Sequence, residues 1–187
     1  MSIPEQTGGL TDRQVHFAKE LLGAAQKYRD MPFVNHAATV RCGANLQTHP
    51  ACMEIGLGPE GYDCSGLVIR ALTDVMGVAD TDWAWGIRHV RQMSRWGNKV
   101  SLLPINSGRD HPLGLLFVYN LLENDVYVPA AHIGIYFGGG TLLHARSRGT
   151  NRVAVDTIRD RRGSKRFAYA IDPGSLVNKL ALLTGEC

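Results

Sequence analysis

The chain has 187 residues, of which 44% are hydrophobic and 20% are charged, a composition typical of one globular domain. Its net charge of +3 is too small for a nucleic-acid-binding protein, and no apolar run reaches the roughly 18 residues of a membrane helix. Four cysteines are too few for a disulfide scaffold in a chain of this length. We expect one domain over residues 1–187, with no cofactor, no nucleic-acid partner and no membrane insertion.

Helices are predicted mainly in the first half of the chain. Thr11 and Gln14 form a capping-box pattern that starts a helix, and Pro32 ends it because the residue before a proline avoids helical angles. A second helix is expected from about Cys64 to Gly77, since the glycine is a suitable C-cap. Two further helices are expected over residues 85–95 and 173–183.

Strands are predicted in the second half, where short apolar or alternating runs recur. They cover residues 113–119, 132–137, 141–145, 152–156 and 166–171. The glycines Gly138 to Gly140 separate the second run from the third, which indicates a hairpin turn. Residues 121–131 are interpreted as an insertion. The pattern predicts an α+β domain, with a core of about residues 11–172 and N-terminal helices packed on a central antiparallel sheet.

Cys64 is the candidate nucleophile. It stands where a glycine-rich loop enters a helix, in the sequence Asp63-Cys64-Ser65-Gly66. The N–H groups and dipole at a helix N-terminus stabilise an anion, so this setting favours the reactive thiolate. The first-turn N–H groups could also form an oxyanion hole. On these residues alone, a small buried cysteine at a helix start stays the alternative interpretation.

His132 and His144 are the candidates for the base and for the residue that orients it. His132 opens a predicted strand and can reach past the sheet edge while Ile133 and Ile135 face elsewhere. A symmetric register, with residues 136 and 140 flanking the turn, would place His144 directly opposite His132. His144 would then bond the second ring nitrogen of His132 and fix its tautomer, as the third member of a triad does.

These segments resemble those of the NlpC/P60 cysteine peptidases. Asp63-Cys64-Ser65-Gly66-Leu67-Val68 is similar to the nucleophile motif of the family, and His132-Ile133-Gly134-Ile135-Tyr136 is similar to its base strand. His144-Ala145 resembles the third catalytic position. The order of the motifs matches as well, over about residues 14–170. The resemblance implies a papain-like α+β fold with the nucleophile at a helix N-terminus.

The resemblance implies an endopeptidase with a Cys-His-His triad, whose partner is the stem peptide of bacterial peptidoglycan. Cys64 would attack a carbonyl, at the bond between D-glutamate and diaminopimelate, and His132 would take the thiol proton while His144 orients it. In several family members the residues flanking the cysteine hold the free amine of the stem peptide. This assigns Asp63 and Ser65 to substrate binding.

Two departures from the family pattern concern the substrate side. Many members have Pro-Tyr where this chain has Pro32-Phe33, so a tyrosine hydroxyl near the oxyanion or substrate is missing, or Tyr62 supplies it. Residues 41–62 resemble an insertion that could wall or cover the cleft. A zinc site, a disulfide and unpaired side chains are the open alternatives for three residues of this segment: Cys42, His49 and Cys52.

Other functions and the cellular location stay open on the sequence. The same superfamily includes amidases and acyltransferases on other amides or lipids, and a weakly catalytic phage tail or wall-binding module would keep the same fold. The N-terminus has neither the basic nor the apolar region of a signal peptide. The wall could then be reached by a phage lysin, by a secreted effector with a delivery or immunity partner, or by a domain excised from a longer chain.

Overall fold

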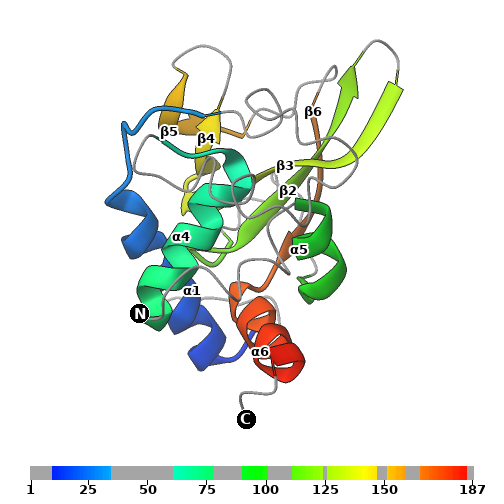
Figure 1. Ribbon diagram of the computed structural model, residues 1–187. Helices are drawn as coiled ribbons and strands as arrows, with labels where there is room; N and C mark the ends of the chain where they lie inside the picture. Colours follow the sequence, from blue (N-terminus) through cyan, green and yellow to red (C-terminus); the bar gives the residue numbers. More distant parts are fainter. Residues whose placement is uncertain are drawn as a thin grey trace, which may run out of the picture.

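Helices and one antiparallel sheet make up the described part of the chain in the computed structural model, which confirms the predicted α+β class (Figure 1). The structure describes residues 10–34, 61–77, 90–100, 111–123, 126–146, 151–158 and 165–184. The helices are α1 (Asp12–Gln26), α4 (Cys64–Met76), α5 (Val90–Trp96) and α6 (Pro173–Thr184). The strands are β1 (Lys99–Val100), β2 (Leu116–Glu123), β3 (Val126–Gly138), β4 (Thr141–Arg146), β5 (Arg152–Thr157) and β6 (Lys165–Ile171). They pair in the order β1-β6-β2-β3-β4-β5.

The predicted helix caps are confirmed. The side-chain oxygen of Thr11 accepts from the N–H of Gln14 at 3.3 Å, and the Gln14 side chain accepts from the N–H of Thr11 at 2.8 Å. This reciprocal capping box starts α1. At the end of α4, Gly77 takes the left-handed conformation with φ 66, which a glycine adopts without a steric penalty.

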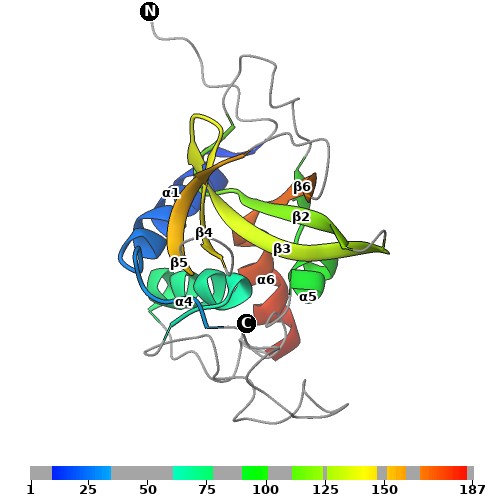
Figure 2. The same ribbon diagram turned by 90° about the horizontal axis from the view of Figure 1, so that it is seen from above.

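The hairpin of β2 and β3 is longer than predicted. Residues 121–123 and 126–131, which belong to the segment interpreted as an insertion, form its outer part, and β3 runs across the molecule (Figure 2). The sequence did not indicate the longer strand, because a proline such as Pro129 normally interrupts a strand. The structure accommodates it with an irregular step in which Ala130 has φ 48 and its N–H donates to the side chain of Asn120 at 2.9 Å. The N–H of Ala130 is thereby hydrogen-bonded at the point where the pairing of β2 and β3 is irregular.

The start of β2 also differs from the prediction. The predicted strand begins at residue 113, but β2 begins at Leu116 because Leu113 and Gly114 form a turn. Gly114 has φ 85, and a Cβ there would lie 1.7 Å from the carbonyl oxygen of Ala18 in α1. A glycine is therefore required where α1 crosses the chain. The two-residue strand β1 was not predicted, and residues 85–89 of the predicted third helix lie outside the described residues.

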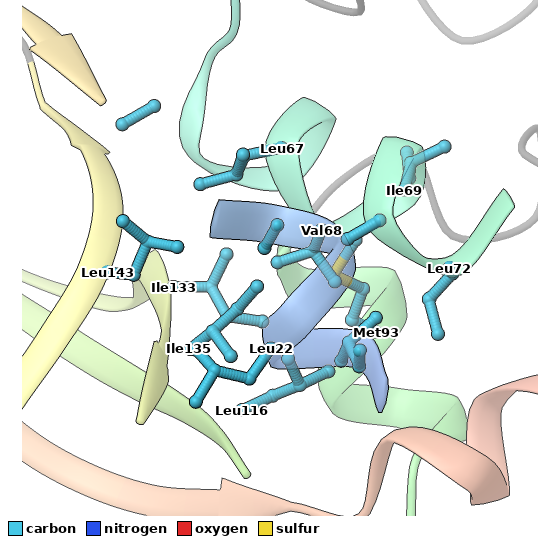
Figure 3. Packing of buried hydrophobic residues seen from close by; sticks show 14 of the residues in the cluster. Leu22, Leu67, Val68, Ile69, Leu72, Met93, Leu116, Ile133, Ile135 and Leu143 are labelled. Carbon is cyan, nitrogen blue, oxygen red and sulfur yellow. The ribbon is translucent and has the colours of Figure 1, made fainter. Parts of the chain in front are cut away.

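α4 lies between α1 and the strands β3 and β4 of the sheet. α4, α5 and α6 lie on the same side of the sheet (Figure 2), and α4 packs on α1, β3 and β4. Burial of one aliphatic side chain contributes about 1.5–3 kcal/mol, so this interface fixes α4 on the two strands that carry the predicted histidines. The core between them is shown in Figure 3 and includes the buried residues Leu67, Val68, Leu72, Leu116, Ile133, Ile135 and Leu143.

Candidate active site

Cys64 is the first residue of α4, as predicted, and a local hydrogen-bond pattern fixes this turn. Oδ1 of Asp63, the N-cap, accepts from the N–H of Gly66 at 2.6 Å and from the hydroxyl of Ser65 at 3.1 Å. Asp63 and Ser65 are buried, with 7% and 4% exposure. Both residues were assigned to substrate binding, and the structure shows them shaping the helix start around Cys64. Their contact with substrate stays a prediction.

The segment that leads into Cys64 lies beside the segment that follows α1. The N–H of Tyr62 donates to the carbonyl of Pro32 at 3.0 Å, and the N–H of Val34 donates to the carbonyl of Tyr62 at 3.1 Å. Gly61 has φ 154, and a Cβ there would lie only 2.4 Å from the Pro32 oxygen. A side chain at position 61 would therefore push the approach to the nucleophile away from its neighbour.

Phe33 and Tyr62 are neighbours in this parallel pairing. The ring of Tyr62 is buried, at 4% exposure, and its centroid lies 4.9 Å from that of Tyr28. Phe33 is partly buried against the same core. Phe33 thus lies beside the nucleophile segment, to which Tyr62 belongs. The suggestion that the Tyr62 hydroxyl replaces the missing one at Phe33 stays a prediction.

The residues after α1 also pair with the edge strand β5. The N–H of Asp30 donates to Val153 at 2.9 Å, and that of Val153 donates to Met31 at 2.8 Å. The N–H of Phe33 donates to Asn151 at 2.9 Å. α1 ends at Gln26, before the predicted stop at the proline, and Asp30 has φ 70. One short segment therefore links β5 to the chain that carries the nucleophile.

The structure brings the two predicted histidines together. Nε2 of His132, on β3, lies 2.6 Å from Nδ1 of His144, on β4. The ring of His144 is buried, and that of His132 is half-buried. Their neighbours Ile133 and Ile135 are fully buried in the core under α4, as the predicted alternation requires. The predicted contact between the histidines is confirmed.

The predicted register of this contact is wrong. Gly138 pairs with Thr141, so the turn consists of Gly139 and Gly140, with φ 55 and 70, as a type I′ hairpin requires. The ladder then shifts, and the next pairs are offset by two residues from the symmetric register. Extending the pairing of Ile135 with Leu143 by one residue places Gly134, not His132, opposite His144. The two histidines therefore meet diagonally, as long side chains on adjacent strands can.

Gly134 explains how the diagonal contact fits. A Cβ at this position would lie 3.1 Å from the Cβ of His144, closer than side chains normally approach. The absent side chain leaves the space over which the rings of His132 and His144 meet. The glycine in the strand motif therefore has a packing role at this site.

Tyr119 lies opposite His132 on the other neighbouring strand, β2. The centroids of the two rings are 6.1 Å apart, and Tyr119 is buried. Burial raises the pKa of Tyr119 far above its ordinary value of 10.0, so the phenol stays neutral. His132 is thus bordered by an uncharged aromatic side chain on β2.

Asp156 is a member of this cluster that the sequence analysis missed. Its Oδ2 lies 2.9 Å from Nε2 of His144, and the guanidinium of Arg146 bonds the same oxygen. The side chain of Asp156 is 32% exposed. The only sequence signal was its place at the end of an alternating strand, where polar residues usually face solvent.

The surroundings of Asp156 lower its pKa below the ordinary value of 3.8. Partial burial raises this pKa, but hydrogen bonds from Arg146 and His144 and the positive charge of both side chains outweigh it. Asp156 is therefore a carboxylate across the neutral range, and it can only accept hydrogen bonds.

These partners fix where the protons lie when both imidazoles are neutral. Because Asp156 only accepts, Nε2 of His144 carries its proton, and Nδ1 of His144 is left with a lone pair. Nε2 of His132 must then donate to it, which leaves Nδ1 of His132 as the basic nitrogen. The arrangement can take a proton at that atom.

The other sequence hypotheses fall partly outside the described residues. The suggested insertion lies there apart from Gly61 and Tyr62, so its role and the alternatives for Cys42, His49 and Cys52 stay predictions. Within the described ranges, no three His, Cys, Asp or Glu side chains are grouped to hold a metal ion. In that same part of the chain, no helix has the length and apolar character to cross a membrane.

Comparison with known proteins identifies the fold. No protein-family model and no curated protein matches the sequence. The P60 domain of an M. avium subspecies paratuberculosis antigen is similar in structure, with 19% identity and a TM-score of 0.51 over 85% of this chain and 96% of that one. An N-acetylmuramoyl-L-alanine amidase from Bacteroides uniformis has 14% identity and a TM-score of 0.51, over 83% of this chain and 98% of the amidase.

A third similar structure, NlpC2 from Trichomonas vaginalis, has 13% identity and a TM-score of 0.51. The match covers 89% of this chain and 49% of NlpC2, so this chain spans about half the length of that protein. The described helices and antiparallel sheet are those of the NlpC/P60 fold.

Proposed function

We propose that this chain is a cysteine peptidase of the NlpC/P60 type that hydrolyses peptide bonds in bacterial peptidoglycan. The observation that carries the proposal is the 2.6 Å contact between His132 and His144, which leaves one basic ring nitrogen. Cys64 begins a capped helix that packs on the two strands holding these histidines. The name of one similar protein, an N-acetylmuramoyl-L-alanine amidase, agrees with a cell-wall substrate.

In the proposed reaction, Nδ1 of His132 takes the proton of the Cys64 thiol. The thiolate attacks the carbonyl carbon of a stem-peptide bond, and a tetrahedral oxyanion forms. His132 then protonates the leaving amine, and the carbon–nitrogen bond breaks to give a thioester on Cys64. Water, deprotonated by His132, hydrolyses the thioester and regenerates the thiol.

The start of α4 stabilises the negative charge of the thiolate and that of the oxyanion. N–H groups of the first turn, including that of Cys64, point toward the end of the helix where the thiolate and oxyanion form. The Asp63 carboxylate accepts from the N–H of Gly66 at 2.6 Å, which fixes the geometry of the first turn. The cap therefore orients the turn whose N–H groups face the reacting atoms.

The finer specificity that we propose is the bond between D-glutamate and diaminopimelate. A carboxylate at Asp63, next to the nucleophile, suits the ammonium of a stem peptide with a free N-terminus. Ser65 bonds that carboxylate and would hold it in place. Phe33 keeps the ring of the tyrosine that many family members have, without its hydroxyl.

Mass spectrometry of purified peptidoglycan fragments tests the proposal, with wild type and Cys64→Ala incubated in parallel under reducing conditions. We expect the wild type to release dipeptides that end in D-glutamate, and the variant to release nothing. Release of whole stem peptides that begin with L-alanine would instead establish an amidase. If folded wild type leaves every fragment intact, the peptidoglycan proposal is wrong.

A further inference from the structure

We propose that Asp156, balanced by Arg146, is a positioning residue that sets the tautomer and proton affinity of the His132–His144 pair. The three residues His132, His144 and Asp156 are called the histidine relay below. Each step joins neighbouring strands, at 2.6 Å from β3 to β4 and 2.9 Å from β4 to β5. The inference deepens the proposed function, because the relay acts on Cys64 only through His132.

The register of β4 and β5 explains why these side chains meet. His144 lies opposite Ala154, and Asp156 is the next residue of β5 on the same face. The small side chain of Ala154 leaves room for the carboxylate to reach diagonally to the imidazole. Arg146 follows His144 on the same face of β4 and reaches the same carboxylate oxygen.

The Asp156 carboxylate determines which ring nitrogen of each histidine carries the proton. A neutral His144 could carry its proton on either nitrogen, and only one tautomer presents a lone pair to His132. With the proton on Nδ1, His144 would donate to His132 and turn the proton of His132 toward the thiol. Asp156 excludes this arrangement because it accepts from Nε2 of His144.

Arg146 limits the negative charge that the histidines experience. The Asp156 carboxylate stabilises an imidazolium and so raises the proton affinity of the pair. Arg146 bonds the same oxygen and offsets part of that charge. The proton affinity of the relay therefore results from two opposing groups. Substitutions at Asp156 and Arg146 should change it in opposite directions, which a purely structural role would not do.

Nuclear magnetic resonance of the imidazole nitrogens tests this directly, in protein carrying Cys64→Ala so that no thiol titrates. We expect both His132 and His144 to carry the proton on Nε2 at alkaline pH. In Asp156→Asn, the apparent proton affinity of the pair should fall about tenfold, and Asp156→Glu should restore most of it. In Arg146→Gln it should rise, by a smaller factor.

Asp30→Asn is the matched control. Asp30 forms an exposed ion pair, at 3.3 Å, with Arg152 of β5, the strand that carries Asp156. Asp30 does not touch the histidines. Its φ of 70 suits an asparagine. This variant should leave the titration of the pair unchanged, whereas a general effect of lost charge would shift it as Asp156→Asn does.

The inference is overturned if Asp156→Asn and Arg146→Gln, both folded, leave the tautomers and proton affinity of the pair unchanged, or shift the affinity in the same direction. The titration needs no substrate. A relay that titrates as expected in a protein that leaves peptidoglycan intact refutes the proposed function alone. Cleavage by Cys64 with an unresponsive titration refutes the relay alone.

Discussion

Two regions of the molecule are built in different ways. The turn at Asp63–Gly66, which we call the nucleophile turn, is held by hydrogen bonds between residues no more than three apart. In the histidine relay, each hydrogen bond joins residues twelve apart in the sequence, on separate strands. The first region requires only that a helix begins at Cys64. The second requires that three strands adopt one register.

This difference predicts how each region responds to substitution. A change in the nucleophile turn removes a local cap, so it should appear first as lost stability. A change in the relay leaves the hydrophobic core under α4 intact, so it should appear first as lost activity. Substitutions in each region should separate these two outcomes.

His132→Ala should have the largest effect. Loss of the general base should lower the rate of peptidoglycan cleavage by about 1,000-fold, with little change in the melting temperature. Release of fragments measured by mass spectrometry against time checks this. His16→Ala is the control, because His16 is 74% exposed on α1, and that variant should keep full activity. A residual rate within tenfold of wild type would remove His132 from the mechanism.

Gly134→Val should affect activity more than stability. Valine suits a strand, but its Cβ would lie 3.1 Å from that of His144 and displace the ring from His132. We expect activity to fall by about 100-fold, since a misplacement near 1 Å can cost that much. In Gly23→Ala, the added methyl in α1 meets nothing within 4 Å, so cleavage should continue at the wild-type rate. Full activity of Gly134→Val would contradict the packing role of Gly134.

Asp63→Ala should lower stability, apart from the loss of the substrate contact proposed for this carboxylate. Loss of the N-cap of α4 should lower the free energy of unfolding by about 1 kcal/mol. Asparagine can still accept the N–H of Gly66, so Asp63→Asn should lose less. Urea denaturation of both variants measures the difference. Equal stability of alanine and asparagine at this position would show that the cap does not hold the turn.

The pH dependence of stability should show the smallest effect. The pKa of Asp156 is lower in the folded protein than in the unfolded chain, so its contribution is fully present above about pH 4. That contribution is lost as the pH falls through the lowered folded-state value. Thermal melts should therefore show wild type more stable than Asp156→Asn at pH 6, with a difference that shrinks toward pH 2. A constant difference would contradict the depressed pKa.

The same contrast explains what the sequence could predict. Cys64 at a helix start and the Thr11 capping box depend on neighbouring residues, and the structure confirms both positions. The contact of His132 with His144 was predicted through the wrong register, because the shift beyond Gly138 depends on the whole hairpin. Asp156 was missed because its partners lie on another strand.

The long β3 strand escaped prediction for a related reason. Pro129 breaks the local strand pattern, and the side chain of Asn120 compensates from β2. Such compensation between strands is invisible in a window of neighbouring residues. The same limit applied to Gly134, whose packing role appears only when His144 lies opposite.

We propose that the nucleophile turn and the histidine relay form one catalytic unit. The most direct test is the rate at which iodoacetamide alkylates Cys64 as a function of pH, in wild type and His132→Ala, followed by mass spectrometry of the peptide that contains Cys64. We predict that wild-type Cys64 reacts rapidly even near pH 6, where an ordinary thiol is almost wholly protonated, and that His132→Ala loses this reactivity. Identical pH profiles for the two proteins would show that His132 does not activate Cys64.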